Sequence, residues 1–238
     1  MPGPTDRPSD RPATDAPSPV VVAVDGTSGS GKSSTSRAVA SRLGLRYLDT
    51  GAQFRAMTWW MLQHGVDVHD ADAVASHAGT PVIESGTDPA DPTITVDGED
   101  ASVAIRTTEV TGAVSPVSTV AEVRTRLLGL QREIIGAGDG VGIVVEGRDI
   151  GSVVWPTAEV KLYLSADASA RAQRRTAEHA HLGDVTSTQA QLLERDTIDS
   201  GRVTAPLVQA DGALAVDTTH LTLDEVVDLV VGLVEEHS

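Results

Sequence analysis

The chain has 238 residues, of which 40% are hydrophobic, enough to bury the core of one large domain or two small ones. It contains no cysteine, which excludes disulfides, zinc fingers and cysteine nucleophiles, and its seven histidines show no metal-ligand spacing. The formal charge of −16 disfavours nonspecific nucleic-acid binding, which depends on basic contacts to phosphates. An anionic ligand must therefore be met by a local cluster of basic side chains.

The N-terminal residues 1–19 combine Pro, Asp, Arg and Ser with almost no large apolar side chain. Such a segment cannot repay the entropy of ordering, so we expect a disordered extension. No apolar run approaches the roughly 20 residues that cross a bilayer, and the N-terminus lacks the pattern of a secretory signal. We therefore expect a cytoplasmic protein that binds neither membrane nor nucleic acid.

From residue 20 onward, short apolar runs alternate with helical patterns. The five runs predicted as strands lie at 20–24, 45–49, 142–146, 159–164 and 213–217. A helix is predicted from Ser33 to about Leu43, where Gly44 ends it, and a last helix begins at the capping box of Thr222 and Glu225. This βαβ order predicts an α/β fold with a parallel sheet covered on both faces. A small β insertion interrupts the pattern at about 80–110.

The residues between the first strand and the first helix, "GTSGSGKS", match the phosphate-binding motif GxxxxGK[ST]. Backbone N–H groups of such a P-loop surround a phosphate, Lys32 can reach the β- and γ-phosphates, and the Ser33 hydroxyl can bind Mg²⁺. The fold class is thus a P-loop NTPase-type five-stranded parallel sheet flanked by helices. A GTPase is set aside because the chain has no [NT]KxD element. Either Glu146 or Asp25 is a candidate to support Mg²⁺.

Several arginines recur after predicted strands and at helix starts. They are Arg55, Arg124, Arg148, Arg195 and Arg202. Arginine binds phosphate oxygens with two hydrogen bonds at once, so this set indicates a second anion site beside the P-loop.

Seven motifs follow one another in the order of a known family. They are "AVDGTSGSGKSS", "YLDTGAQFRA", "VDGEDASVAIRTTEVTGAVSPVSTVAEVR", "VVEGRDIGSVVWP", "LYLSADASARAQRR", "ERDTIDSGRVTAPL" and "AVDTT". Together they resemble the bacterial cytidylate kinases, nucleoside monophosphate kinases with an inserted monophosphate-binding region. The resemblance spans residues 20 to about 236, and the "GEDASVAIRTTEV" block and "EGRDIG" are its most specific parts.

The resemblance implies a kinase domain at 20–238, with a lid at about 176–190, that phosphorylates CMP and dCMP with ATP and Mg²⁺ in pyrimidine nucleotide metabolism. The residues it places around ATP are Gly26, Thr27, Ser28, Gly29, Ser30, Gly31, Lys32, Ser33, Ser34, Arg171 and Arg175. Those it places around the monophosphate are Thr50, Arg55, Ser115, Arg124, Arg148, Asp149, Arg195, Asp199 and Arg202. Lys32, Arg195 and Arg202 would act in catalysis, and Ser33 would bind the metal.

Cytosine offers an amino donor beside ring and carbonyl acceptors, so its recognition needs an acceptor such as Asp149 facing donors such as Arg148 and Ser115. Uracil would leave that acceptor without a hydrogen bond, and the free-energy cost of this would make the site reject uracil. The monophosphate already carries an anionic oxygen, so no general base is required. Arg171, Arg174 and Arg175 would belong to a lid over ATP.

The chain departs from the family pattern at three positions. Proline is usual at Thr27, an apolar residue at Gln53 and aspartate at Glu146. The aromatic cluster around Trp59 and Trp60 is expected to be core, with only Phe54 bordering the substrate.

Two other functions fit a P-loop. One is a kinase for UMP, AMP or shikimate, which the insertion and the Arg148–Asp149 pair disfavour. The other is a noncatalytic ATP-dependent switch, which would need no second anion pocket. We expect a monomer, because no heptad pattern or long exposed apolar face is present.

Overall fold

The computed structural model describes residues 19–138, 140–178, 185–202 and 205–236. Nearly all of the predicted N-terminal extension, and the middle of the predicted lid, therefore lie outside the described residues. The division of the chain into extension, kinase domain, insertion and lid stays a prediction.

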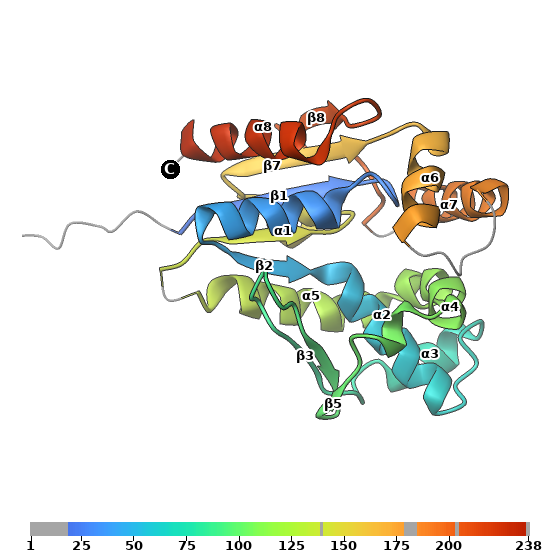
Figure 1. Cartoon of the computed structure of the whole chain (residues 1–238). Coiled ribbons are helices and arrows are strands. Elements are labelled where there is room, and N and C mark those ends of the chain that lie inside the picture. The colour runs from blue at the N-terminus through green and yellow to red at the C-terminus, as the bar shows by residue number, and fades with distance from the viewer. Residues whose placement is uncertain (1–18, 139, 179–184, 203–204, 237–238) are drawn as a thin grey trace, which may run out of the picture.

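A five-stranded parallel sheet forms the centre of the molecule, in the order β2-β6-β1-β7-β8 (Figure 1). Its strands are β1 (Val21–Gly26), β2 (Arg46–Asp49), β6 (Ile143–Glu146), β7 (Val160–Ser165) and β8 (Leu214–Asp217). All five coincide with the predicted apolar runs, so the predicted α/β fold is confirmed. The strands point the same way, and their carboxyl ends meet at one edge of the sheet (Figure 1).

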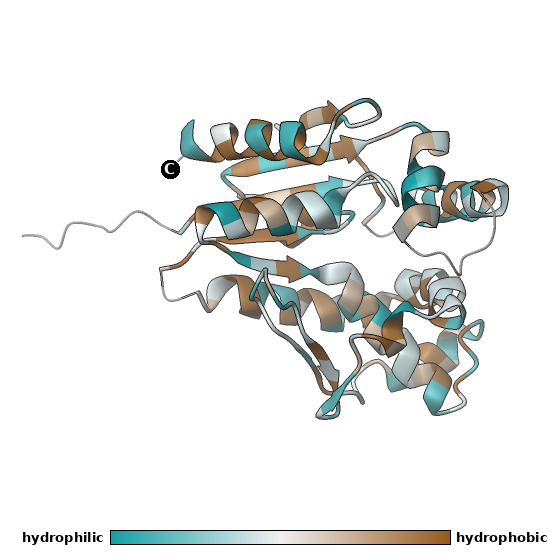
Figure 2. Cartoon of the chain, in the orientation of Figure 1, coloured by the Kyte–Doolittle hydropathy of each residue, from teal (hydrophilic) through white to brown (hydrophobic). Residues whose placement is uncertain are grey.

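The two faces of the sheet are buried under different helices. Val22 and Val24 of β1 pack into a cluster with residues of α1 (Lys32–Leu43) and α8 (Leu223–Glu236). The alternate residues of β1 pack on the other face, where α5 (Ala121–Gly136) and the π-helical turn η2 (Ile150–Val154) contribute side chains. Because both faces are covered, the strands are apolar throughout rather than alternating with polar residues. Figure 2 shows this apolar interior as brown strands.

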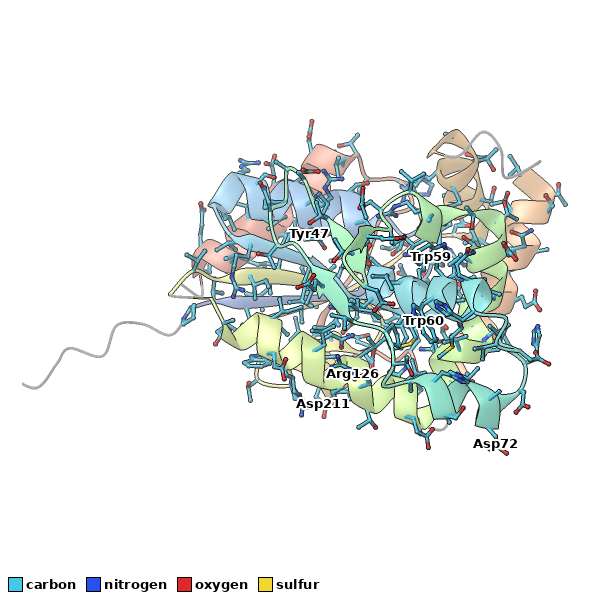
Figure 3. The ribbon with its side chains drawn as sticks, turned by 90° about the horizontal axis from the view of Figure 1, so that it is seen from below. Tyr47, Trp59, Trp60, Asp72, Arg126 and Asp211 are labelled. Carbon is cyan, nitrogen blue, oxygen red and sulfur yellow. The ribbon has the colours of Figure 1, made fainter. Side chains whose placement is uncertain are left out.

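A second apolar core lies beyond the end of β2. It is built by α2 (Thr50–Gln63), α3 (Ala71–His77), η1 (Ala104–Arg106) and α4 (Thr108–Thr119), together with α5. A three-stranded antiparallel sheet packs on it, with β3 (Ile83–Ser85), β4 (Ile94–Val96) and β5 (Glu99–Asp100). These strands lie within the predicted insertion. Trp60 is buried in this core, as predicted, and Trp59 packs against it partly buried; Figure 3 shows both along α2.

Two further helices, α6 (Ala168–Glu178) and α7 (Val185–Ser200), pack against each other at the carboxyl ends of the strands (Figure 1). They lie on the side of β7 and β1, while α2 and α4 lie on the side of β2. The carboxyl edge of the sheet therefore faces helices from both halves of the chain. Within the described part of the chain, no helix is both long and apolar enough to cross a bilayer.

Two helix ends confirm the predicted stop and start signals. Gly44 follows α1 in a left-handed conformation, with φ of +66°, and its N–H bonds to Ala40 O. Before α8, Thr222 N donates to Glu225 Oε2 at 2.8 Å, and Glu225 N donates to Thr222 Oγ1 at 3.3 Å. This reciprocal capping box fixes the start of the helix that closes one face of the sheet.

We expect Thr222→Ala to lower the free energy of unfolding by about 1 kcal/mol, because it removes the hydroxyl that caps Glu225 N. The matched control is Thr125→Ala in α5, where an exposed hydroxyl only bonds back to Ala121 O. Alanine favours the helix interior, so this control should stay within about 0.5 kcal/mol of the parent. Urea unfolding followed by circular dichroism gives both values. Equal losses in the two variants would contradict a capping role.

Candidate functional site

The P-loop joins β1 to α1 at the carboxyl edge of the sheet. Gly26, Gly29 and Gly31 have φ of +147°, +78° and +88°, in the region that favours glycine. A Cβ on Gly26 would lie 1.9 Å from Leu164 O of β7, so only glycine fits there. Lys32 Nζ donates to Thr27 O at 2.7 Å, and the side chain is buried. The loop thus curls around its own lysine.

The charge on Lys32 is poorly compensated. Burial, and then repulsion from Arg148, lower the pKa of this lysine from 10.5 to about 7, although Glu146, Asp196 and Asp25 act in the opposite direction. A polyphosphate bound in the loop would supply the missing negative charge. The site is therefore electrostatically suited to an anion.

Glu146 ends β6 directly beside the P-loop helix. Its two carboxylate oxygens accept hydrogen bonds from Ser33 Oγ, at 2.9 Å, and from Tyr47 OH. The carboxylate is buried, and burial followed by the nearby charge of Asp49 raises the pKa of Glu146. A hydroxyl and a carboxylate side by side form an oxygen donor set of the kind that Mg²⁺ prefers.

Asp25 has a different environment. Its two oxygens accept the backbone N–H groups of Ile150 and Gly151, at 2.7 and 2.8 Å. Burial raises the pKa of Asp25 to about 6, against the effect of these two hydrogen bonds. Asp25 thus holds the start of η2, and with it the preceding residues Arg148 and Asp149, against the end of β1.

A single pocket runs from the P-loop to α4 and α7. It is lined by Ser28, Gly29, Lys32, Ser33, Asp49, Thr50, Gly51, Phe54, Arg55, Arg106, Val114, Ser115, Ser118, Arg124, Glu146, Gly147, Arg148, Asp149, Arg175, Arg195, Asp199 and Arg202. Seven arginines and one lysine face four carboxylates in this set. In a chain with a formal charge of −16, this local excess of positive charge indicates an anionic ligand.

Ion pairs hold several of these arginines in place. Arg124 Nη2 bonds to Asp149 Oδ2 at 2.5 Å, and Arg148 Nε bonds to Asp199 Oδ2 at 2.9 Å. Arg202 pairs with the other oxygen of Asp199 and donates to Ser118 Oγ of α4 at 2.9 Å. Burial would otherwise make these charges costly, and the interleaved carboxylates compensate part of that cost. Arg124 also lies over the Phe54 ring, 5.5 Å from its centre.

The pKa is lowered for three arginines of the pocket, Arg55, Arg195 and Arg202. Burial and then repulsion from Arg55 and Arg148 lower the pKa of Arg195 to about 9, and its buried Nε has no hydrogen-bond partner among the described residues. Burial also lowers the pKa of Arg55. An anion between these side chains would satisfy the free donor and relieve the repulsion.

A second pocket borders the P-loop next to the start of α8. Ser30, Gly31 and Ser34 line it together with Arg174, Thr218 and the start of α8. Arg174 Nη2 donates to Thr218 O at 2.6 Å, and Thr218 Oγ1 donates to Ser30 O at 3.0 Å. The P-loop therefore contributes residues to both pockets.

The structure brings all nine predicted monophosphate residues into one pocket, with Lys32, Ser33 and Arg175. Gly26, Thr27 and Arg171 line neither pocket. Arg171 lies behind the loop, with its guanidinium buried against Ser28 O and Asp196. The sequence did not point to Asp49, Arg106 and Ser118 as pocket residues, nor to Tyr47 as a partner of Glu146. Single polar residues of these types carry no local signal, so only the tertiary fold reveals them.

The fold and this pocket define an α/β protein of the P-loop nucleotide-binding class. The sequence model of the cytidylate kinase family matches residues 22–236, and the chain belongs to this family. A cytidylate kinase of Streptomyces griseus is 60% identical over 92% of this chain and 94% of its own length. One from Rhodococcus opacus is 47% identical over 93% and 97%. An uncharacterized protein of Eubacterium ventriosum has a similar fold, with a TM-score of 0.51 at 8% identity over 91% and 98% of the two chains.

We expect the binding of ATP without metal at pH 8 to take up protons, because phosphates raise the lowered pKa of Lys32 and the lysine then gains a proton. Because the free protein loses the positive charge of Lys32 as pH rises through about 7, kcat/KM for ATP should fall over the same range. Calorimetry in Tris and in HEPES measures the uptake as a difference in apparent heat. Lys32→Met should abolish it, and Lys161→Met, at the only other lysine, should retain it. Equal heats for the parent protein in both buffers would contradict the lowered pKa.

Proposed function

We propose that the protein transfers the γ-phosphoryl group of ATP to CMP and dCMP, releasing ADP. One observation carries this proposal: a single pocket joins P-loop Lys32 to a set of seven arginines. Such a pocket suits two phosphate-bearing substrates that meet end to end. Membership of the cytidylate kinase family supports the choice of CMP.

On the donor side, the backbone of the P-loop and the N-terminus of α1 bind the ATP phosphates. Lys32 stabilises the charge that develops on the transferred group. We assign the support of Mg²⁺ to Ser33 and Glu146, because their oxygens lie side by side, whereas both oxygens of Asp25 hold backbone N–H groups. When bound, Mg²⁺ would neutralise charge on the phosphates.

On the acceptor side, Arg55, Arg195 and Arg202 hold the monophosphate. One of its anionic oxygens attacks the γ-phosphorus in line, and the bond to the bridging oxygen of ADP breaks. No general base is needed, because the nucleophile is already ionised. The protein contributes positioning and electrostatic stabilisation.

The base lies between α4 and the segment that follows β6. The Asp149 carboxylate accepts a hydrogen bond from the amino group of cytosine. Arg124 holds that carboxylate in a fixed orientation through the 2.5 Å ion pair. Ser115 and Arg148 donate to the ring nitrogen and carbonyl oxygen. Asp199, fixed between Arg148 and Arg202, accepts from the sugar hydroxyls. Thr50 also lines the pocket, and its hydroxyl donates to Glu146 O at 2.7 Å.

The arginines of α6 divide between two tasks. Arg175 lines the main pocket and is placed to contact the ATP phosphates. Arg171, predicted beside it, is buried behind the P-loop, so we assign it to the support of the loop rather than to direct contact with ATP.

Substrate specificity tests the proposed reaction. We expect ADP release from ATP and Mg²⁺ with CMP and dCMP at least tenfold faster than with UMP, AMP or shikimate, measured by a coupled assay. Lys32→Ala should lower kcat by about 10²–10³-fold, since it removes a charge that stabilises the transition state. ATP binding without turnover of any acceptor would favour a nucleotide-dependent switch instead.

Base recognition is tested at Asp149. In Asp149→Asn we expect the ratio of kcat/KM for CMP to that for UMP to fall by about 10- to 100-fold, because an amide can donate to uracil where the carboxylate only accepts. The control is Asp211→Asn, the same change at an exposed carboxylate that does not line the pocket, and this variant should keep the parent ratio. Asp211 is labelled in Figure 3. An unchanged ratio in Asp149→Asn would rule out this base readout.

A further inference from the structure

Both backbone polar groups of Ser28, in the P-loop, are bonded to one side-chain ion pair. Ser28 N donates to Asp196 Oδ1 at 3.1 Å, and Arg171 Nη1 donates to Ser28 O at 2.9 Å. The same Arg171 nitrogen pairs with the second oxygen of Asp196. Arg171 belongs to α6 and Asp196 to α7, so this arrangement joins three separate segments at one residue of the P-loop.

The contact is closely packed. The side chains of Arg171 and Asp196 are only 6% and 15% exposed. A Cβ on Gly29 would lie 3.3 Å from Arg171 Cβ, so α6 packs directly against the loop. Hydrogen bonds to charged groups are stronger than neutral ones, and low exposure reduces the competition from water. The loop therefore cannot shift at Ser28 without moving α6 and α7 or losing these bonds.

Helix α7 also supplies the acceptor side of the main pocket. Arg195, adjacent to Asp196, lines that pocket, as do Asp199 one turn later and Arg202 beyond the end of the helix. Arg202 continues the connection to α4 through Ser118 Oγ. One helix thus contacts the donor loop through Asp196 and the acceptor pocket through three other residues.

We propose that Asp196 and Arg171 are positioning residues that couple the two substrate sites. Phosphates that fix the P-loop also fix Ser28, and through this ion pair they set the position of α7 and its arginines for the acceptor. Neither residue needs to touch a substrate. The inference rests on the proposed function and deepens it, because it requires a donor and an acceptor that bind in the same pocket.

The test is a binding cycle on the full chain. The Kd of CMP is measured by calorimetry with and without a nonhydrolysable ATP analogue, in the parent protein and in Asp196→Asn. We expect the analogue to tighten CMP binding at least fivefold in the parent, within the usual range of coupling between sites. In Asp196→Asn this factor should fall below about twofold, while kcat falls about 10- to 100-fold, as the loss of a charge-assisted hydrogen bond implies.

Two further variants separate coupling from general stability. Arg171→Met should lose the coupling in the same way, and the double variant should lose no more than either single variant, because the two side chains act as one unit. The matched control is Asp228→Asn, which breaks the exposed Arg42–Asp228 pair between α1 and α8. This control should keep the coupling factor of the parent protein even if its melting temperature changes.

A measurement on the parent protein does not depend on how the variants fold. The Ser28 amide, bonded to Asp196, should exchange slowly with deuterium in the absence of nucleotide. Fast exchange would overturn the proposal, as would parent binding without coupling or an unchanged coupling factor in Asp196→Asn. Tighter binding of the ATP analogue to Asp196→Asn would show instead that this carboxylate only occupies the place of a phosphate. Turnover of CMP by the parent tests the proposed function separately.

Discussion

The parallel pairing of β1 with β6 is the constraint on which the site depends. Val24 lies opposite Glu146 in this register, and Gly147 N donates to Val24 O at 3.0 Å. Parallel strands end at the same edge, so the P-loop that follows β1 and the Arg148–Asp149 pair that follows β6 emerge side by side. Asp25 then bonds across to Ile150 and Gly151 and fixes their separation. This strand pair thus places the P-loop beside the Arg148–Asp149 pair, and α2 and α7 bring Arg55 and Arg195 to the same pocket.

The pocket keeps its arginines together through partial charge compensation. Asp149 and Asp199 pair with Arg124, Arg148 and Arg202, but the pKa values of Arg195 and Arg202 remain lowered, and the Nε of each has no hydrogen-bond partner among the described residues. Buried ion pairs contribute little net stability, so this arrangement is better explained by ligand binding than by folding. The interleaved carboxylates orient the cations, and the remaining excess of positive charge is left for phosphate. Because the chain as a whole is acidic, with a formal charge of −16, this excess of positive charge is confined to the site.

The sequence predicted the elements of the fold better than their contacts. Each of the five apolar runs became a strand, and Gly44 and the Thr222–Glu225 box ended and began helices where expected, because these signals are local. The order β2-β6-β1-β7-β8 could not be read in this way, since β1 pairs with strands more than a hundred residues away. The resemblance to a family supplied the pocket residues. Partners such as Tyr47 for Glu146, or Asp196 for Ser28, depend on tertiary packing that no motif encodes.

The placement of Arg195 and Asp196 shows how one short motif can serve two sites. Successive residues of a helix point about 100° apart, so neighbours in sequence face different surroundings. Arg195 and Asp199, four residues apart on α7, line the acceptor pocket together with Arg202 beyond the end of the helix, while Asp196 reaches the P-loop. A search of the sequence for phosphate-binding arginines finds Arg195 and Arg202 but overlooks Asp196. Because Asp196 is opposite in sign to those arginines, it can hold an N–H of the loop without competing with them for phosphate.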